Sequence, residues 1–187
     1  MSIKFSKSNF YIFVALKKNQ QMRKIFLTAA IAVFGFANAQ NDAFSGKGDL
    51  KLNIGANVQS GGAGIMTSLD YGLGESFSIG AQAGYLLGID EVYGDKSRME
   101  HRFDVKARAS AHLGDVIGLP ANFDVYPGLN LGLKNFGAHA GARYFFKKGF
   151  GVFTEIQVPL AKYNTDSDNY RLFNNQFAFM AGVSFDL

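Results

Sequence analysis

Apolar and polar positions alternate along much of this chain, and the alternation is strict between residues 49 and 59. Every second residue from Leu50 to Val58 is apolar, and the residues between them, such as Lys51 and Asn53, are polar or small. A period of two predicts an extended strand with one apolar and one polar face. The same alternation runs from residue 177 to Leu187.

Recurrence of this pattern predicts eight strands. They cover residues 49–59, 64–73, 76–86, 99–113, 122–131, 136–146, 150–160 and 175–187. A series of alternating strands behind a secretion signal is typical of membrane barrels. The sequence therefore predicts an all-β fold, namely an eight-stranded antiparallel up-and-down transmembrane β-barrel.

The secretion signal lies near the N-terminus. Met22-Arg23-Lys24 is followed by an apolar stretch, residues 25–36, and by Ala37-Asn38-Ala39, which are the charged, apolar and small-residue regions of a signal peptide. A transmembrane helix needs about 20 apolar residues, more than this stretch supplies, and the alternative is a buried N-terminal helix. We expect residues 1–39 to be a removed leader and signal peptide, residues 40–48 a short periplasmic segment, and residues 49–187 the outer-membrane barrel.

The net charge changes when the leader is removed. The whole chain has 19 basic and 15 acidic residues, and six of the basic residues but none of the acidic ones precede Gln40. The mature chain would carry 13 basic and 15 acidic residues, a net charge of −2, so the basic pI does not indicate nucleic-acid binding. The absence of cysteine excludes disulfides and thiolate metal sites.

The longest connections between the predicted strands are odd-numbered, and the even-numbered connections are short. The two longest, residues 87–98 and 161–173, are the third and seventh, whereas residues 74–75, 114–120 and 147–149 form the short even-numbered ones. Outer-membrane barrels have short periplasmic turns and longer outside loops. We therefore expect both chain termini on the periplasmic side and the long loops outside.

The apolar face of the strands carries aromatic residues near the strand ends. Tyr71, Phe77, Tyr144, Phe146 and Phe185 are predicted to form a girdle at the periplasmic side, with Tyr85 and Phe103 at the outer side. Aromatic girdles mark both interfaces of membrane barrels. Alternation alone does not show which face of a strand points into a barrel.

The polar face carries the charges expected in the barrel lumen. The predicted charge network consists of Lys51, Asp70, Asp104, Lys106, Arg108, Asp124, Arg143 and Glu155. Because eight strands leave an interior just wide enough for side chains, these charges must pair. We expect a filled, salt-bridged lumen, and the alternative is a proton or ion path.

The end of the chain resembles the C-terminal assembly signal of bacterial outer-membrane barrels. Phe179, Val183, Phe185 and Leu187 alternate up to the last residue, with Leu187 in place of the usual terminal aromatic. Together with the strand count, the mature length and the strand end Gly141–Phe146, this resembles the small OmpA/OmpX-type barrels of Gram-negative bacteria. The resemblance implies insertion by the barrel-assembly machinery into the bacterial outer membrane, without a periplasmic domain after Leu187.

The sequence offers little catalytic chemistry. His112 and His139 lie on the lumen face, where we expect packing roles, because dispersed histidines lack ligand spacing. Some lipid-modifying barrel enzymes pair a histidine with a serine near the outer rim, but no serine matches His101. We therefore predict no catalytic, cofactor-binding or metal-binding residues, no cofactor, and no enzyme activity.

The sequence thus favours a small structural barrel, or one that interacts through its extracellular loops. Alternatives are an accessory subunit of an envelope complex, a narrow pore and a lipid-modifying enzyme. The expected partners are outer-membrane lipid, the assembly machinery and an extracellular or envelope protein, with no nucleic acid.

Overall fold

The computed structural model describes residues 42–89, 102–147, 149–163 and 173–187. The predicted leader, His101 and most of the two long connections lie outside these residues. The described residues all belong to one compact unit, residues 37–187. In the described ranges, no helix has both the length and the apolar character needed to cross a membrane.

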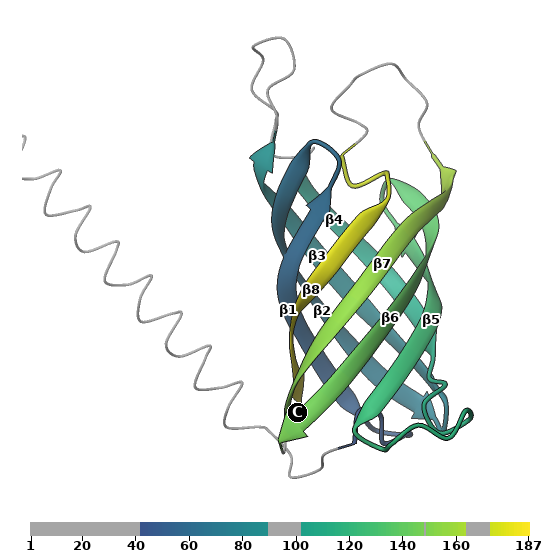
Figure 1. The fold of residues 1–187 in the computed structure, drawn as a ribbon. Coiled ribbons are helices and arrows are strands. Elements are labelled where there is room, and N and C mark those ends of the chain that lie inside the picture. The colour runs from purple at the N-terminus through teal and green to yellow at the C-terminus, as the bar shows by residue number, and fades with distance from the viewer. Residues whose placement is uncertain (1–41, 90–101, 148, 164–172) are drawn as a thin grey trace, which may run out of the picture. The chain divides into compact units, whose positions relative to one another are not determined.

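The described chain forms eight strands that close into a barrel (Figure 1). They are β1 (Leu50–Gln59), β2 (Gly62–Gly74), β3 (Phe77–Ile89), β4 (Phe103–Ala111), β5 (Phe123–Gly132), β6 (Asn135–Lys147), β7 (Phe150–Lys162) and β8 (Ala178–Asp186). Each strand pairs antiparallel with its sequence neighbour, and β8 pairs with β1 to close the sheet. The predicted all-β, eight-stranded antiparallel barrel is confirmed.

Two strands begin three or more residues later than the sequence pattern predicts. β4 begins at Phe103, whereas the alternation starts at Met99, and β8 begins at Ala178 instead of Asn175. The backbone of Asn174 has φ of 60°, a left-handed conformation that asparagine tolerates and a strand does not continue through. The chain therefore turns before it enters β8.

The barrel has two different ends, which we call lower and upper as drawn in Figure 1. β1 begins and β8 ends at the lower end, where the turns after β2, β4 and β6 also lie. The connections after β3 and β7, the two longest, both belong to the upper end because all neighbouring strands are antiparallel. This arrangement agrees with the predicted loop parity.

The register gives every strand one outward and one inward face. β7 shows this most regularly, because exposed and buried residues alternate from Phe150 to Val158. The outward residue Ile54 is paired with Thr67 on β2 and with Val183 on β8. The inward face is mainly polar, with one small apolar cluster made of Met66, Phe153, Ala178 and Met180.

Candidate functional site in the barrel interior

The eight charged residues predicted for the lumen are all buried, and some of their contacts cross the barrel interior. The most exposed of them, Lys106, is 8% accessible, and Arg143 and Glu155 are each 1% accessible. They do not form one cluster. The structure divides them into a central group, an upper group and a lower group along the barrel.

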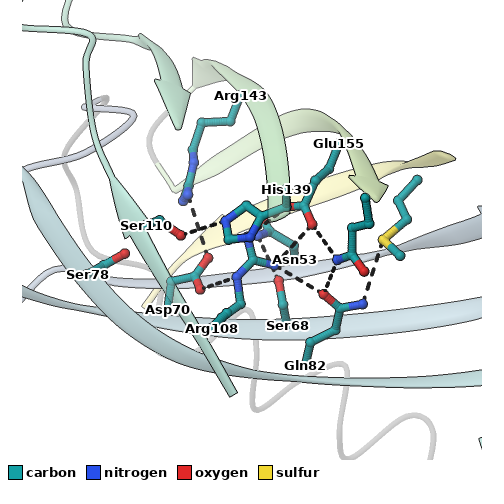
Figure 2. Close-up of polar contacts among 12 residues, drawn as sticks. Asn53, Ser68, Asp70, Ser78, Gln82, Arg108, Ser110, His139, Arg143 and Glu155 are labelled. Atoms are coloured by element: carbon teal, nitrogen blue, oxygen red, sulfur yellow. Dashed lines mark hydrogen bonds and ion pairs between the residues drawn. The ribbon is translucent and has the colours of Figure 1, made fainter. Parts of the chain in front are cut away.

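Arg108 on β4 organises the central group (Figure 2). Its guanidinium donates to Glu155 on β7 at two points, from Nη2 to Oε2 at 2.7 Å and from Nη1 to Oε1 at 3.4 Å. Its Nε lies 3.0 Å from Oδ1 of Asp70 on β2. Since β4 is not a neighbour of β2 or β7 in the sheet, these ion pairs span the interior rather than following the wall.

Arg143 on β6 lies beside this group and is held mainly by a ring. Its guanidinium carbon is 4.3 Å from the centroid of the fully buried Tyr126 ring, a cation–π geometry. Its Nη2 lies 3.6 Å from Oδ2 of Asp70, and its Nε lies 3.8 Å from Oδ2 of Asp124. Arg143 thus links the central group to the lower end of the barrel.

The upper group consists of Asp104 and Lys106 with two glutamines. The ammonium of Lys106 lies 3.5 Å from Asp104 and donates a 2.9 Å hydrogen bond to Gln157. Gln157 in turn donates to both Gln82 and Glu155. The carboxamides therefore join the upper group to the central ion pairs.

The lower group contains Lys51. Its ammonium lies 2.7 Å from Asp49 and 2.9 Å from Asp186 at the end of β8, and it lies 5.2 Å from the centroid of the Phe145 ring. Because Lys51 is on β1, these contacts join the first and last strands of the barrel. Asp49 does not belong to the predicted charge network.

A serine, a histidine and a carboxylate are aligned near the lower end. The Oγ of Ser78 lies 2.8 Å from Nε2 of His112, and Nδ1 of His112 lies 2.6 Å from Oδ2 of Asp124. In a neutral imidazole, Nδ1–H would donate to Asp124 and Nε2 would accept from Ser78. The same order of groups is used in serine hydrolases.

The position of Ser78 limits what this alignment can do. Ser78 is 1% accessible, and the ring of Phe44 covers His112 at a centroid distance of 3.5 Å and an angle of 5°. A nucleophile must reach the atom that it attacks. The arrangement therefore fits a buried hydrogen-bonded support better than an accessible nucleophile.

A second serine–histidine pair lies deeper in the barrel. Ser110 on β4 is 2.9 Å from Nε2 of His139 on β6, and both side chains are buried. The alternation predicts that both residues face the lumen, but it does not predict that they contact each other. Neither pairing could be found from the sequence, because the strand register and stagger bring the partners together.

Histidine, aspartate and glutamate are the side chains of the described ranges that could ligate a metal ion. No group of three or more histidine, cysteine, aspartate or glutamate side chains is arranged there to hold an ion. His101, the histidine considered for the enzyme alternative, lies outside the described residues.

The predicted girdle residues have the outward phase of their strands. Tyr71, Phe77, Phe103, Tyr144 and Phe146 are exposed, and Tyr85 is half-buried. Phe185 differs, because it is only 8% accessible and its ring lies 5.6 Å from that of Phe150. Phe150 also contacts Phe146, which contacts Tyr144, so the lower-end aromatics form a continuous row across β6, β7 and β8.

The residues of the predicted assembly signal lie on and just after β8. Phe179 is exposed, Val183 is half-buried, and both have the outward phase. The amide of Leu187 donates to the carbonyl of Leu50 at 2.9 Å. The last residue therefore extends the β1–β8 seam beyond the strand.

Comparisons with known proteins add the family. A search of the curated proteins finds no match. One solved structure, titled "De novo design of transmembrane beta-barrels", is similar with a TM-score of 0.49 and 10% sequence identity, covering 75% of this chain and 97% of that chain. A likeness of this size carries no functional information. A family model, described as a family of unknown function (DUF6646), matches residues 32–187, and the chain belongs to this family.

Proposed function

We propose that this protein is a sealed barrel of the bacterial outer membrane that serves as an anchor and acts through its outer connections. It spans the bilayer with both chain ends on the periplasmic side, conducts no ions and catalyses no reaction. Its partners are outer-membrane lipid, the assembly machinery and an envelope or extracellular protein.

The membrane assignment is based on the polarity of the barrel, which is the reverse of that of a water-soluble barrel. Large apolar side chains such as Ile65, Ile79 and Leu129 are about half exposed on the outside, whereas Arg108 and Glu155 are buried inside. A water-soluble barrel buries its apolar face and exposes its charges. An apolar outer surface of this extent is stable when lipid covers it.

The dimensions of the wall are consistent with a bilayer. The strands have 9 to 13 residues, and a tilted transmembrane strand needs about 9–11. Outward aromatics lie near both ends, with Phe103 at the upper end and Tyr71, Phe77 and Tyr144 at the lower end. These rings would lie at the two headgroup regions.

Polar and aromatic side chains contact one another at several levels of the interior, and these contacts support the proposal of a closed barrel. The central ion pairs of Arg108 cross the lumen. At the upper end, Asn135 donates hydrogen bonds to Asn174 and Asn175, and both asparagines are buried. At the lower end, Phe44 lies on His112. A continuous water path is not expected through these layers.

Fractionation and electrical recording test this proposal. We expect the protein in the outer-membrane fraction after a carbonate wash, with a band shift on heating in SDS gels. Recovery from the soluble periplasm would contradict the membrane assignment. Purified protein in planar bilayers is expected to give no reproducible conductance steps, and such steps would favour the narrow pore instead.

A further inference from the structure

The segment before β1, residues 42–49, is folded into the lower mouth of the barrel, and we call it the strap. The amide of Ala43 donates to the carbonyl of Ala121 at 2.7 Å, and Ala43 is fully buried. Further along, Gly48 donates to Gly72, and Gly72 donates to Asp49. The strap is therefore tied to the β4–β5 turn at one end and to β2 at the other.

The backbone of the strap is shaped by glycine. Gly46 and Gly48 have φ of 91° and 88°, which glycine adopts without the steric cost that other residues incur. Gly46 is buried against β2, and a Cβ added to Gly72 would overlap its carbonyl oxygen. The strap thus fits closely enough that one methyl group on β2 would displace it.

The strap places Phe44 directly on His112. The two rings are parallel within 5°, with centroids 3.5 Å apart. Beneath the strap, the imidazole contacts Ser78 and Asp124. His112 is therefore enclosed by the strap on one side and by the barrel interior on the other.

We propose that the strap is an acid-released latch, which closes the lower mouth while His112 is neutral and opens when His112 takes up a proton. The latch concerns the barrel itself and does not depend on the membrane in which the barrel resides. Opening would uncover the lower mouth without breaking the central ion pairs of Arg108.

The charged groups around His112 support the proposed direction, in which acid opens the latch. Burial lowers the pKa of His112 below its usual value near 6.5, and Arg143 on β6 lowers it further. Asp124 on β5 and Asp70 on β2 act in the opposite direction but do not cancel the effect. Phe44 and the rim carboxylates Glu75 and Asp115 line the recess beside the His112 ring. The centroid of the Tyr126 ring lies 6.1 Å from that of His112.

Because the closed state binds the proton more weakly than an open, hydrated state, acid favours opening. The closed latch is most stable above the ordinary histidine pKa and loses stability as the pH falls below it. One proton allows the ratio of closed to open latch to fall by at most about tenfold per pH unit.

A single spin label tests the latch. The chain has no cysteine, so Lys47→Cys places one nitroxide on an exposed strap position. In detergent micelles, electron paramagnetic resonance of the labelled barrel is expected to show an immobile component at pH 8 and a several-fold larger mobile component at pH 5. An unchanged spectrum between these values would overturn the latch.

Three further variants separate His112 from other causes. His112→Phe keeps a ring under Phe44 but cannot titrate, so its spectrum should be independent of pH. If it responds as the parent does, the carboxylates Asp49 and Asp186 drive the release and the proposal is wrong. Gly72→Ala should give a mobile label at both pH values, whereas Gly74→Ala, where an added Cβ meets nothing within 4 Å, should match the parent.

A titration of His112 itself remains decisive if the ring variant does not fold. The chain has three histidines, so imidazole NMR signals can be assigned by single replacements. In Phe44→Ala, the pKa of His112 is expected to rise toward 6.5 because the ring becomes hydrated. An unchanged pKa in this variant would show that the strap does not control His112, and would overturn the proposal.

Discussion

Arg108 and Glu155 form a two-point ion pair across the barrel, although they lie 47 positions apart in the sequence and their strands are not neighbours. Both side chains are buried, and they also contact Gln82, Gln157 and Asp70. A two-point guanidinium–carboxylate pair is strong and fixes the geometry of both groups. This pair thus holds opposite walls of the barrel at a defined separation.

Removal of one partner should be costly. Glu155→Ala leaves the Arg108 guanidinium buried without its main counter-charge, and we expect a loss of about 3–5 kcal/mol in the free energy of unfolding. Urea unfolding in detergent, followed by the heat-dependent band shift, measures this. The outward neighbour offers a control, because Ile156→Val should change stability by less than about 1.5 kcal/mol. Equal effects at both positions would contradict the inward assignment of Glu155.

The outer wall can be tested at Ala109, which has the outward phase and is paired with Ile79 and Leu129. In the proposed membrane orientation, Ala109→Arg places a charge on the lipid face two residues from the lower end of β4. We expect a cost between about 1 kcal/mol, the value near an interface, and about 2–4 kcal/mol, the value at the bilayer midplane, or a block of insertion. Ala109→Leu adds bulk without charge and should insert normally. If both variants assemble equally well in native membranes, lipid does not contact this face.

Gly141 allows Tyr126 to lie flat against the neighbouring strand. The two residues are direct register partners, and a Cβ on Gly141 would overlap the Tyr126 ring. Gly141→Ala should therefore displace the ring from Arg143 and destabilise the barrel by about 1–3 kcal/mol or more. Gly84→Ala is the matched control, because its nearest atom would be 3.7 Å away. Urea unfolding of both variants gives the comparison.

Ser78 is expected to be chemically silent despite its alignment with His112 and Asp124. A fluorophosphonate probe should not label the folded protein, because the Ser78 hydroxyl is buried and a nucleophile needs access. A known serine hydrolase in the same sample serves as the positive control. Labelling that disappears in Ser78→Ala would instead establish a nucleophile and reopen the enzyme alternative.

The effect of a substitution at Ser110 cannot be predicted from the alternation of apolar and polar residues alone. From its lumen phase alone, Ser110→Ala would be expected to be nearly neutral, since alanine is also small. The hydroxyl of Ser110 is bound to the buried ring of His139, and an unsatisfied buried polar group costs about 1–3 kcal/mol. We therefore expect Ser110→Ala to be destabilising, measured by the same unfolding assay.

The sequence by itself determined the strands and the division of residues between their two faces. The period of two is a local property of an extended backbone, so Lys51 and Asn53 share a face wherever the strand lies. The eight-strand count and the loop parity follow from the same local pattern. The exact strand ends differ from the pattern, for example at β3, which runs to Ile89, and before β8, where Asn174 is left-handed.

The tertiary structure decided which face is inside and which side chains meet. Alternation is identical for a soluble barrel and for its inverse, and only closure of the sheet directs Arg143 inward and Ile79 outward. The contacts of Arg108 with Glu155 and of Ser78 with His112 depend on how far each strand is shifted along its neighbour, a global property of the closed sheet. The strap over His112 likewise arises from two left-handed glycines and a tertiary ring contact, which leave no periodic signal in the sequence.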